Sequence, residues 1–335
     1  MARHPLTERA LAATRRVLRT RGYQPRTEGT YLGWVRRFLV HHRHPHPREL
    51  DAGHVERFLS HLANTRRCSA STRNQAASAL AFFYREVLRS DAVVSVPRAR
   101  GRGRLPTVLS HGEAQAVLGE LRGRPWLVAS LLYGTGMRLS EALGLRVKDL
   151  DFELARITVR EGKGGRDRVV MLPQTLAQPL RRQLEVVKEQ HRADRRRGRG
   201  WAPLPHALHA KSPDAGWDPA WQFLFPGRAE HPDPATDRRG RTPLHPSAIQ
   251  RAVKRAVRRA GIHKPATCHT FRHSFATQLL RDGYDIRVVQ ELLGHSDVRT
   301  TMIYLHVADQ MGLSVRSPLD RQGAGRPEAS GPRRL

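Results

Sequence analysis

Six side chains from residue 138 onward have the types that chemistry at a phosphate diester needs. They are two guanidiniums, an ammonium, two imidazoles and a phenol: Arg138, Arg272, Lys163, His269, His295 and Tyr304. His269 and Arg272 stand three residues apart near the start of a predicted helix, so they share one face, and the free N–H groups at that end favour an anion. Each stretch alone is a weak signal, but together they indicate attack on phosphorus.

Two arginines could stabilise the charge that develops during such an attack. Negative charge grows on two non-bridging oxygens, and the planar guanidiniums of Arg138 and Arg272 can donate paired hydrogen bonds to them, which a lysine ammonium cannot. His269 and His295 could donate hydrogen bonds or move protons, because imidazole titrates near neutral pH. No set of metal ligands is evident in the sequence, so we expect neither a metal nor another cofactor.

The order of these residues and the sequences around them resemble the tyrosine recombinases, a family that includes phage integrases and Xer-type enzymes. The resemblance rests on GTGMRLSE at 134–141, Lys163 in a predicted hairpin, HTFRH at 269–273, LLGH at 292–295 and Tyr304. It implies that Tyr304 attacks DNA to form a 3′-phosphotyrosyl ester, that Lys163 protonates the leaving 5′-oxygen, and that religation needs no ATP. Only about 0.1% of free tyrosine is ionised near pH 7, so neighbouring cations would have to activate the phenol.

Two other interpretations of these stretches remain open. Cys268, His269 and His273 could begin a zinc site, because the histidines stand one helical turn apart. The fourth ligand is unclear, however, and a neighbouring arginine would place a cation beside the metal. The tyrosines at other positions could be nucleophiles, but they fall in apolar helical patterns, and we expect them in the core: Tyr31, Tyr84 and Tyr133.

Composition favours a nucleic-acid partner. The 335 residues carry a formal net charge of +29, from 59 Lys and Arg against 30 Asp and Glu, which suits a polyanion. A basic membrane-surface protein is the competing class, and no strongly amphipathic terminal helix supports it. No membrane-spanning run or secretory pattern occurs, and two cysteines are too few for a disulfide framework. We therefore expect a cytoplasmic protein that makes no membrane contact.

Periodicity predicts a mainly helical fold with a small β-sheet. Residues 1–90 favour a bundle of three or four helices, and residues 91–109, which are basic and rich in Gly and Pro, favour a linker. In the second domain, 110–335, the segments 156–160 and 168–172 favour a β-hairpin, whereas 193–245 has no clear pattern. The other segments expected to be helical begin with a capping box at Ser110 and Glu113 and continue at 124–133, 138–144, 175–192, 246–260, 268–281, 285–293 and 297–306.

The resemblance assigns these regions as well. It implies a SAM-like core-binding domain at 1–90, a basic linker at 91–109 and a tyrosine-recombinase catalytic domain at 110–335. The stretch at about 193–245 resembles the insertion of integron integrases, as do the sequences DGYDIR at 282–287 and VRSPLD at 315–320.

An integron integrase would recombine gene-cassette attC sites, folded from one DNA strand into a hairpin, with attC or double-stranded attI sites. The resemblance implies that unpaired bases of the hairpin are read by the insertion, and that four protomers assemble on two sites, with a monomer possible off DNA. The candidate DNA-contacting residues are Arg73, Trp217, Trp221, His245, Lys254 and Arg255. For the two tryptophans, a role in anchoring the insertion is equally open, as is a merely solvated basic face for the helix at 246–260.

Two alternative functions remain. A Xer-type or phage recombinase acting on ordinary duplex would be indifferent to hairpin folding. A catalytically inactive DNA-binding protein would form no covalent adduct, although all six catalytic positions are filled in this sequence.

Overall fold

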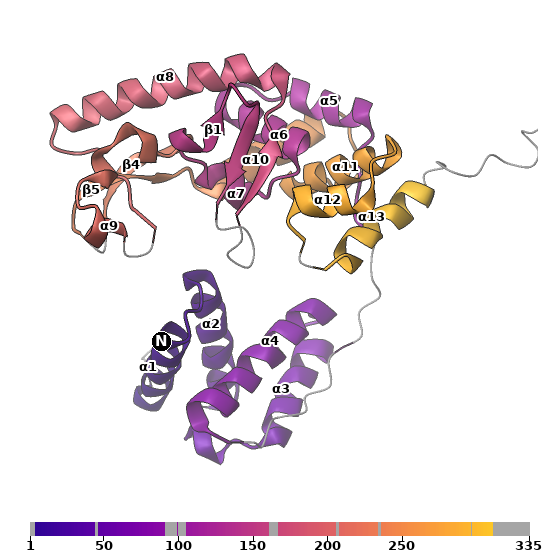
Figure 1. Ribbon diagram of the computed structural model, residues 1–335. Coiled ribbons are helices and arrows are strands. Elements are labelled where there is room, and N and C mark those ends of the chain that lie inside the picture. The colour runs from indigo at the N-terminus through magenta and orange to yellow at the C-terminus, as the bar shows by residue number, and fades with distance from the viewer. Residues whose placement is uncertain are drawn as a thin grey trace, which may run out of the picture. The chain divides into compact units, whose positions relative to one another are not determined.

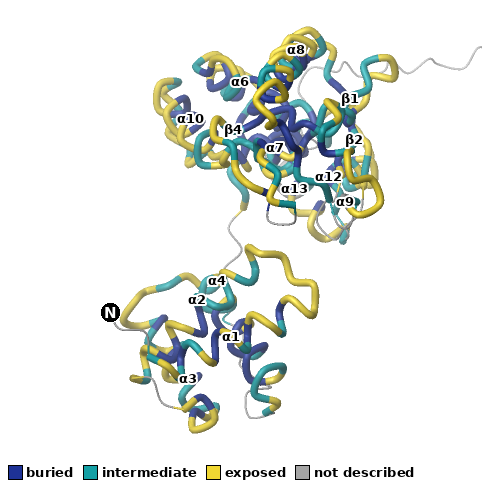
Figure 2. Tube along the Cα trace, turned by 90° about the vertical axis from the view of Figure 1, so that its left-hand side faces the viewer, coloured by how far each residue is buried: buried dark blue, intermediate teal, exposed yellow. Residues whose placement is uncertain are grey.

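The computed structural model describes residues 4–43, 46–90, 99, 105–160, 167–205, 208–233, 236–295 and 297–310. The chain divides into two compact units, Met1–Arg104 and Leu105–Leu335, and each has its own buried core (Figures 1 and 2). The expected mainly helical fold with small β-sheets is confirmed. None of the described helices is long and apolar enough to cross a membrane.

The first unit is a helical bundle. Its described elements are α1 (Pro5–Thr20), α2 (Pro25–His41), η1 (Pro47–Glu49), α3 (Ala52–Asn64), α4 (Ala70–Phe82) and the π-helical turn η2 (Phe83–Leu88). Proline at the first position of α1 and of α2 suits a helix start, because its missing N–H would be unpaired there anyway. The apolar stripes expected from periodicity meet in one core, where Val35, Phe38 and Phe83 are fully buried.

The second unit places its helices around a larger core. The long helices are α5 (His111–Gly119), α6 (Gly123–Thr135), α8 (Gln174–Arg196), α10 (Pro246–Arg259), α11 (Cys268–Arg281), α12 (Ile286–Leu293) and α13 (Arg299–Gln310), with the short α7 (Leu139–Gly144) after α6. The predicted capping box of Ser110 and Glu113 begins α5. Figure 1 shows α11, α12 and α13 gathered together, and α11 packs against α6.

A three-stranded antiparallel sheet lies beside these helices, in the order β1 (Leu150–Asp151), β2 (Arg156–Val159) and β3 (Arg168–Met171). Ile157 pairs with Val170, and both side chains are buried in the core. The predicted β-hairpin is confirmed as β2 and β3. Residues 161–166 between the strands, and Lys163 with them, lie outside the described residues.

The stretch from 193 to 245 contains a second sheet that the sequence did not predict. It has two antiparallel strands, β4 (Pro226–Pro232) and β5 (Arg239–Pro243), and follows the short helix α9 (Leu208–Lys211) and the turns η4 (Ala215–Trp217) and η5 (Pro219–Trp221). Strands that contain proline and glycine and lack apolar alternation give no period-two signal. Local sequence could not reveal this sheet, which depends on contacts outside the strands.

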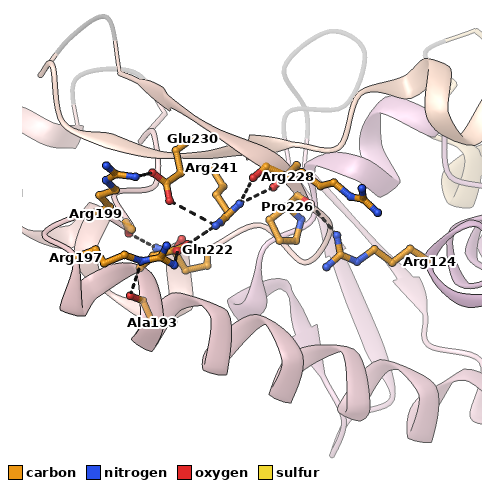
Figure 3. A network of polar contacts seen from close by, with 12 residues as sticks. Arg124, Ala193, Arg197, Arg199, Gln222, Pro226, Arg228, Glu230 and Arg241 are labelled. Carbon is orange, nitrogen blue, oxygen red and sulfur yellow. Dashed lines mark hydrogen bonds and ion pairs between the residues drawn. The ribbon is translucent and has the colours of Figure 1, made fainter.

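Those contacts are mostly polar. Arg241 of β5 is largely buried, and its Nε lies 2.6 Å from Oδ2 of Asp194 at the end of α8. It also lies 3.5 Å from Glu230 of β4, within a network that Figure 3 shows together with Arg199 and Arg228. The indole of Trp201, which is fully buried, donates to Asp233 at 2.7 Å. The ion pair of Arg241 with Asp194 connects the insertion to α8, and the bond of Trp201 to Asp233 joins two parts of the insertion itself.

Candidate active site

The site is built around a buried arginine. Arg272 is on α11 and only 1% of its surface is exposed. One guanidinium nitrogen donates to the carbonyl oxygen of Gly136 at 2.5 Å, and another donates to that of Leu293 at 2.6 Å and to Nε2 of His295 at 3.0 Å. Burial and the nearby charge of Arg138 lower the pKa of Arg272 to about 10, so it is still charged at neutral pH. This one cation connects the segment before Arg138 with the segment that carries His295.

A turn at Gly136 makes this arrangement possible. Gly136 ends α6 with φ +67°, a left-handed conformation that glycine adopts without strain. A side chain at this position would also collide with Phe275 and Leu293. Arg138 follows as the residue that caps α7, so its side chain starts beside the carbonyl that Arg272 binds.

A buried carboxylate holds Arg138 in place. Glu141, whose side chain is 7% exposed, accepts hydrogen bonds from the backbone N–H and the guanidinium of Arg138, both at 2.7 Å. It also accepts two bonds from Arg168 of β3, at 3.1 and 2.7 Å. Burial opposes ionisation of Glu141, but the hydrogen bonds from Arg168 and Arg138 and the charge of Arg168 prevail and lower its pKa to about 2. Arg168 further donates to the carbonyl of Leu292 at 2.8 Å, so the β-hairpin is joined to α12.

Tyr304 of α13 points into the same site and is 4% exposed. Its hydroxyl lies 2.9 Å from Nδ1 of His273, and its ring is stacked with that of His295, with 6.2 Å between centroids. Burial raises the pKa of Tyr304, which outweighs the opposing effect of the positive charges of Arg272 and Arg138. The phenol is therefore neutral at neutral pH in this arrangement.

Two histidines of α11 lie against each other near the tyrosine. The rings of His269 and His273 meet edge to face with 4.3 Å between centroids. Loss of surrounding water and then the charges of Arg272 and Arg138 lower the pKa of His269. Burial and then the charges of His269 and Arg272 lower the pKa of His273 to about 4. Both imidazoles are thus uncharged at neutral pH and can accept a proton.

The structure brings together five of the six residues expected to do chemistry: Arg138, His269, Arg272, His295 and Tyr304. The sixth, Lys163, lies outside the described residues. Sequence reasoning did not assign Glu141, Arg168 or His273 to this site. The spacing of Arg138 and Glu141, three residues apart at a helix start, is a capping-box pattern that could have revealed the first of them.

The other interpretations of these stretches gain no support. Cys268 is buried, and burial raises the pKa of its thiol to about 11, although a zinc ligand must be a thiolate. Among the described residues, no group of three or more His, Cys, Asp and Glu side chains is placed to hold a metal ion. Of the other tyrosines, Tyr84 is 1% exposed in the first unit, and Tyr31 and Tyr133 pack against the two cores.

The two tryptophans of the insertion occupy different surroundings. Trp217 packs edge to face on Trp201, and the guanidinium of Arg195 lies 4.5 Å from its ring centroid. Trp221 has the ammonium of Lys148 2.8 Å from its ring centroid. It also lines a cavity of about 630 Å³ that extends to Glu141 and has Arg146, Lys148 and Arg160 among its walls.

The remaining candidates for DNA contact are spread over both units. His245 is exposed and caps α10, with its Nδ1 accepting from the N–H of Ser247 at 3.3 Å. Lys254 and Arg255 are exposed on α10. Arg73 is half-buried on α4 of the first unit and lines a hollow there with Asn64 and Asn74. The exposed Lys254 and Arg255 could reach a phosphate. His245 is exposed as well, but it already serves as the N-cap of α10.

The arrangement suits attack by a phenol on a phosphorus centre. Two guanidiniums, from Arg138 and Arg272, lie near the phenol of Tyr304, close enough to favour its ionised form electrostatically. The neutral imidazole of His273 lies 2.9 Å from the same hydroxyl. Such a site supplies fixed positive charge for an anionic transition state and a proton acceptor for the nucleophile.

Comparisons with known proteins agree on one family. The model described as the phage integrase family matches residues 108–311, and that of the phage integrase N-terminal SAM-like domain matches 11–92. An integrase/recombinase of Escherichia coli is 52% identical over 300 residues, which are 89% of either chain. A tyrosine recombinase XerC of Lactobacillus delbrueckii subsp. bulgaricus is 34% identical over 260 residues, 74% of this chain and 76% of that one.

The fold is shared with a solved recombinase. The XerH site-specific recombinase, in its pre-cleavage complex with difH substrate, aligns with a TM-score of 0.61 and 20% identity over 90% of this chain and 83% of that one. At this identity the likeness shows the fold alone.

We predict that Glu141→Gln destabilises the second unit by about 3–5 kcal/mol, because it leaves charged partners facing a buried neutral amide. Since the folded pKa of about 2 lies below the usual 4.5, the carboxylate stabilises the fold above pH 4.5. The difference between wild type and variant should shrink as pH falls from about 4.5 toward 2. Urea unfolding of the full chain across this pH range measures it.

Glu185→Gln is the matched control. Its carboxylate is 67% exposed and pairs with Lys188 at 2.8 Å on the surface of α8, so little change in stability is expected. Equal effects of the two substitutions would contradict a special role for the buried carboxylate.

Proposed function

The chain belongs to the phage integrase family and is a tyrosine site-specific recombinase, which cleaves and rejoins DNA, and within that family we propose that it is an integron integrase with Tyr304 as its nucleophile. The observation that carries the nucleophile assignment is the position of the Tyr304 hydroxyl, buried beside Arg272 and hydrogen-bonded to an imidazole. A phenol in this position has a proton acceptor and two nearby cations, the requirements for attack on a phosphate diester.

The proposed reaction divides the work among the site residues. Arg138 and Arg272 bind the non-bridging oxygens of the scissile phosphate, with His269 and His295 as hydrogen-bond donors. The Oη of Tyr304 bonds to phosphorus, the bond to the 5′-oxygen breaks, and Lys163 gives that oxygen a proton. Because the 3′-phosphotyrosyl ester preserves the bond energy, a 5′-hydroxyl can reverse the reaction without ATP.

The substrates that we propose are gene-cassette sites. A folded attC hairpin would present unpaired bases to the insertion, and an attI duplex would supply the second site, with four protomers on the paired sites. The cavity lined by Trp221, Lys148 and Arg160 supports this proposal, because it combines an aromatic face with positive charge. Cationic side chains already pack on both rings, Arg195 on Trp217 and Lys148 on Trp221. We favour Trp221 as the platform because it lines this cavity, whereas Trp217 also packs on Trp201.

The alternative is a Xer-type enzyme acting on ordinary duplex. The 34% identity to a protein named XerC favours it. A protein of this kind would not distinguish a folded strand from its complement, so substrate choice separates the two proposals.

The first prediction of this proposal tests the nucleophile. Tyr304→Phe removes only the attacking oxygen, so DNA binding should persist while the covalent adduct disappears. A radiolabelled attC bottom strand incubated with each protein and run on a denaturing protein gel measures the adduct, and a mobility-shift assay measures binding. An adduct that persists in Tyr304→Phe would assign the attack to another residue.

The second prediction separates guanidinium geometry from charge. Arg138→Lys keeps the positive charge but loses the planar fork, so cleavage should slow by about 10²–10³ while DNA affinity changes little. Arg138 is a cleaner test than Arg272, whose side chain also holds two buried carbonyls. Arg156→Lys changes an exposed side chain at the start of β2; it is the control and should cleave at the wild-type rate. Normal cleavage by Arg138→Lys would contradict the clamp.

The third prediction concerns strand choice. The wild type should bind the folded bottom strand of an attC site better than its complement, and Trp221→Ala should reduce this preference by roughly 1–3 kcal/mol if a base stacks there. Lys254→Ala, which removes an exposed charge, should instead weaken binding to both strands alike and lower its salt dependence. Titrations of each strand over a salt series measure both effects. Equal wild-type affinity for the two strands would favour the Xer-type alternative.

A further inference from the structure

The hydrogen bond between His273 and Tyr304 has a direction that the neighbouring groups determine. Nδ1 of His273 lies 2.9 Å from the phenolic oxygen. Burial, His269 and Arg272 disfavour a charged His273, and burial keeps the phenol protonated. With both groups neutral, the O–H of Tyr304 can donate to the lone pair on Nδ1. The contact therefore joins the nucleophile, still carrying its proton, to an available base.

His295 is already committed to other partners. A guanidinium can only donate, so Nε2 of His295, 3.0 Å from Arg272, must be the unprotonated nitrogen. The proton of the neutral ring is then on Nδ1, where it points to Oγ1 of Thr301 at 2.9 Å. In this tautomer His295 donates through Nδ1, and its lone pair on Nε2 already accepts from Arg272. It therefore does not provide the acceptor for the O–H of Tyr304.

His269 lies one step farther from the nucleophile. Its ring rests edge to face on His273, with 4.3 Å between the centroids, while the ring of His273 is the one in contact with Tyr304. His269 lies at the N-terminal end of α11 and is exposed, where it can reach a bound phosphate. The two histidines thus face different partners.

We propose that His273 is the general base of the cleavage step, accepting the proton of Tyr304 at Nδ1 as the phenolic oxygen bonds to phosphorus. This inference rests on the proposed role of Tyr304. The O–H bond of Tyr304 breaks, its proton moves to Nδ1, the Oη–P bond forms, and the P–O5′ bond breaks with a proton supplied by Lys163. In religation His273 returns its proton to the departing phenol.

DNA binding would strengthen this base. The groups that contact the imidazole or act on its charge are His269 and Arg272 on α11 and Tyr304 on α13. His295 and Arg138 adjoin this set through Tyr304, because the ring of His295 stacks on the phenol and Arg138 acts on its charge. Burial is the main cause that keeps the free imidazole neutral, and the charges of His269 and then Arg272 act in the same direction. A phosphate bound to Arg272 would offset the charge of that guanidinium, so His273 would become more basic when substrate is present.

The test uses His273→Asn in the full-length protein. An asparagine amide can still accept a hydrogen bond from the phenol but cannot take up its proton, so the variant separates positioning from proton transfer. General bases typically contribute about 10²–10⁴ in rate, and we expect single-turnover adduct formation to slow by at least about 100-fold, with unchanged DNA affinity and thermal stability. His263→Asn, an exposed histidine between α10 and α11, is the matched control and should behave as wild type.

The pH profile distinguishes a base from a structural contact. Above the pKa of the base, the wild-type rate should be independent of pH, whereas the rate of His273→Asn should rise about tenfold per pH unit toward the pKa of the phenol, which burial raises above its usual value. A profile that keeps the wild-type shape would mean that His273 only positions the tyrosine.

A second substrate separates acid from base. The substrate is an attC bottom strand in which sulfur replaces the bridging 5′-oxygen at the cleavage position, which is first mapped with the wild-type protein. The leaving group is then a thiolate, which needs no proton. This substrate should restore cleavage to Lys163→Ala but not to His273→Asn. Near-normal cleavage by His273→Asn overturns the inference. A wild-type protein that forms no Tyr304-dependent adduct on either substrate overturns the proposed function instead.

Discussion

The burial of one positive charge organises the catalytic unit. A guanidinium removed from water is costly unless its donors are satisfied, and Arg272 satisfies them with carbonyl oxygens of Gly136 and Leu293 and with an imidazole nitrogen. Since these partners come from separate segments, the arginine fixes the turn before Arg138 relative to the turn that carries His295. These three partners carry no negative charge, so the charge of Arg272 is balanced only in part, by Glu141 nearby. The site therefore retains positive potential toward an anion.

A second connection fixes the β-hairpin. Glu141 accepts bonds from Arg138 and Arg168, and Arg168 also bonds to Leu292. Strand β3 is thereby joined to α7 and α12. Because one carboxylate faces two arginines, it positions Arg138 and leaves a net positive charge. These contacts fix the start of β3, the strand that follows Lys163 in the sequence.

Much of this could be predicted from the sequence, and the remainder could not for identifiable reasons. Helical periodicity and capping located α5, α10 and α11, and alternation located β2 and β3, because these signals are local. The sheet of β4 and β5 depends instead on Arg241 meeting Asp194, 47 residues away in the chain. His273 was visible only as a histidine one turn from another. Its contact with Tyr304 depends on how α11 and α13 pack, which no local pattern encodes.

In the free site, the phenol of Tyr304 and the imidazole of His273 are both buried and uncharged at neutral pH. A phenolate at neutral pH would require the cations to overcome the cost of burial, and in the free site burial prevails. Burial, and after it the charges of His269 and Arg272, keeps His273 from becoming charged. A phosphate changes this balance, since it occupies the positive potential and leaves the imidazole free to accept a proton. In the mechanism that we propose, proton transfer is then coupled to the presence of the bond to be cut.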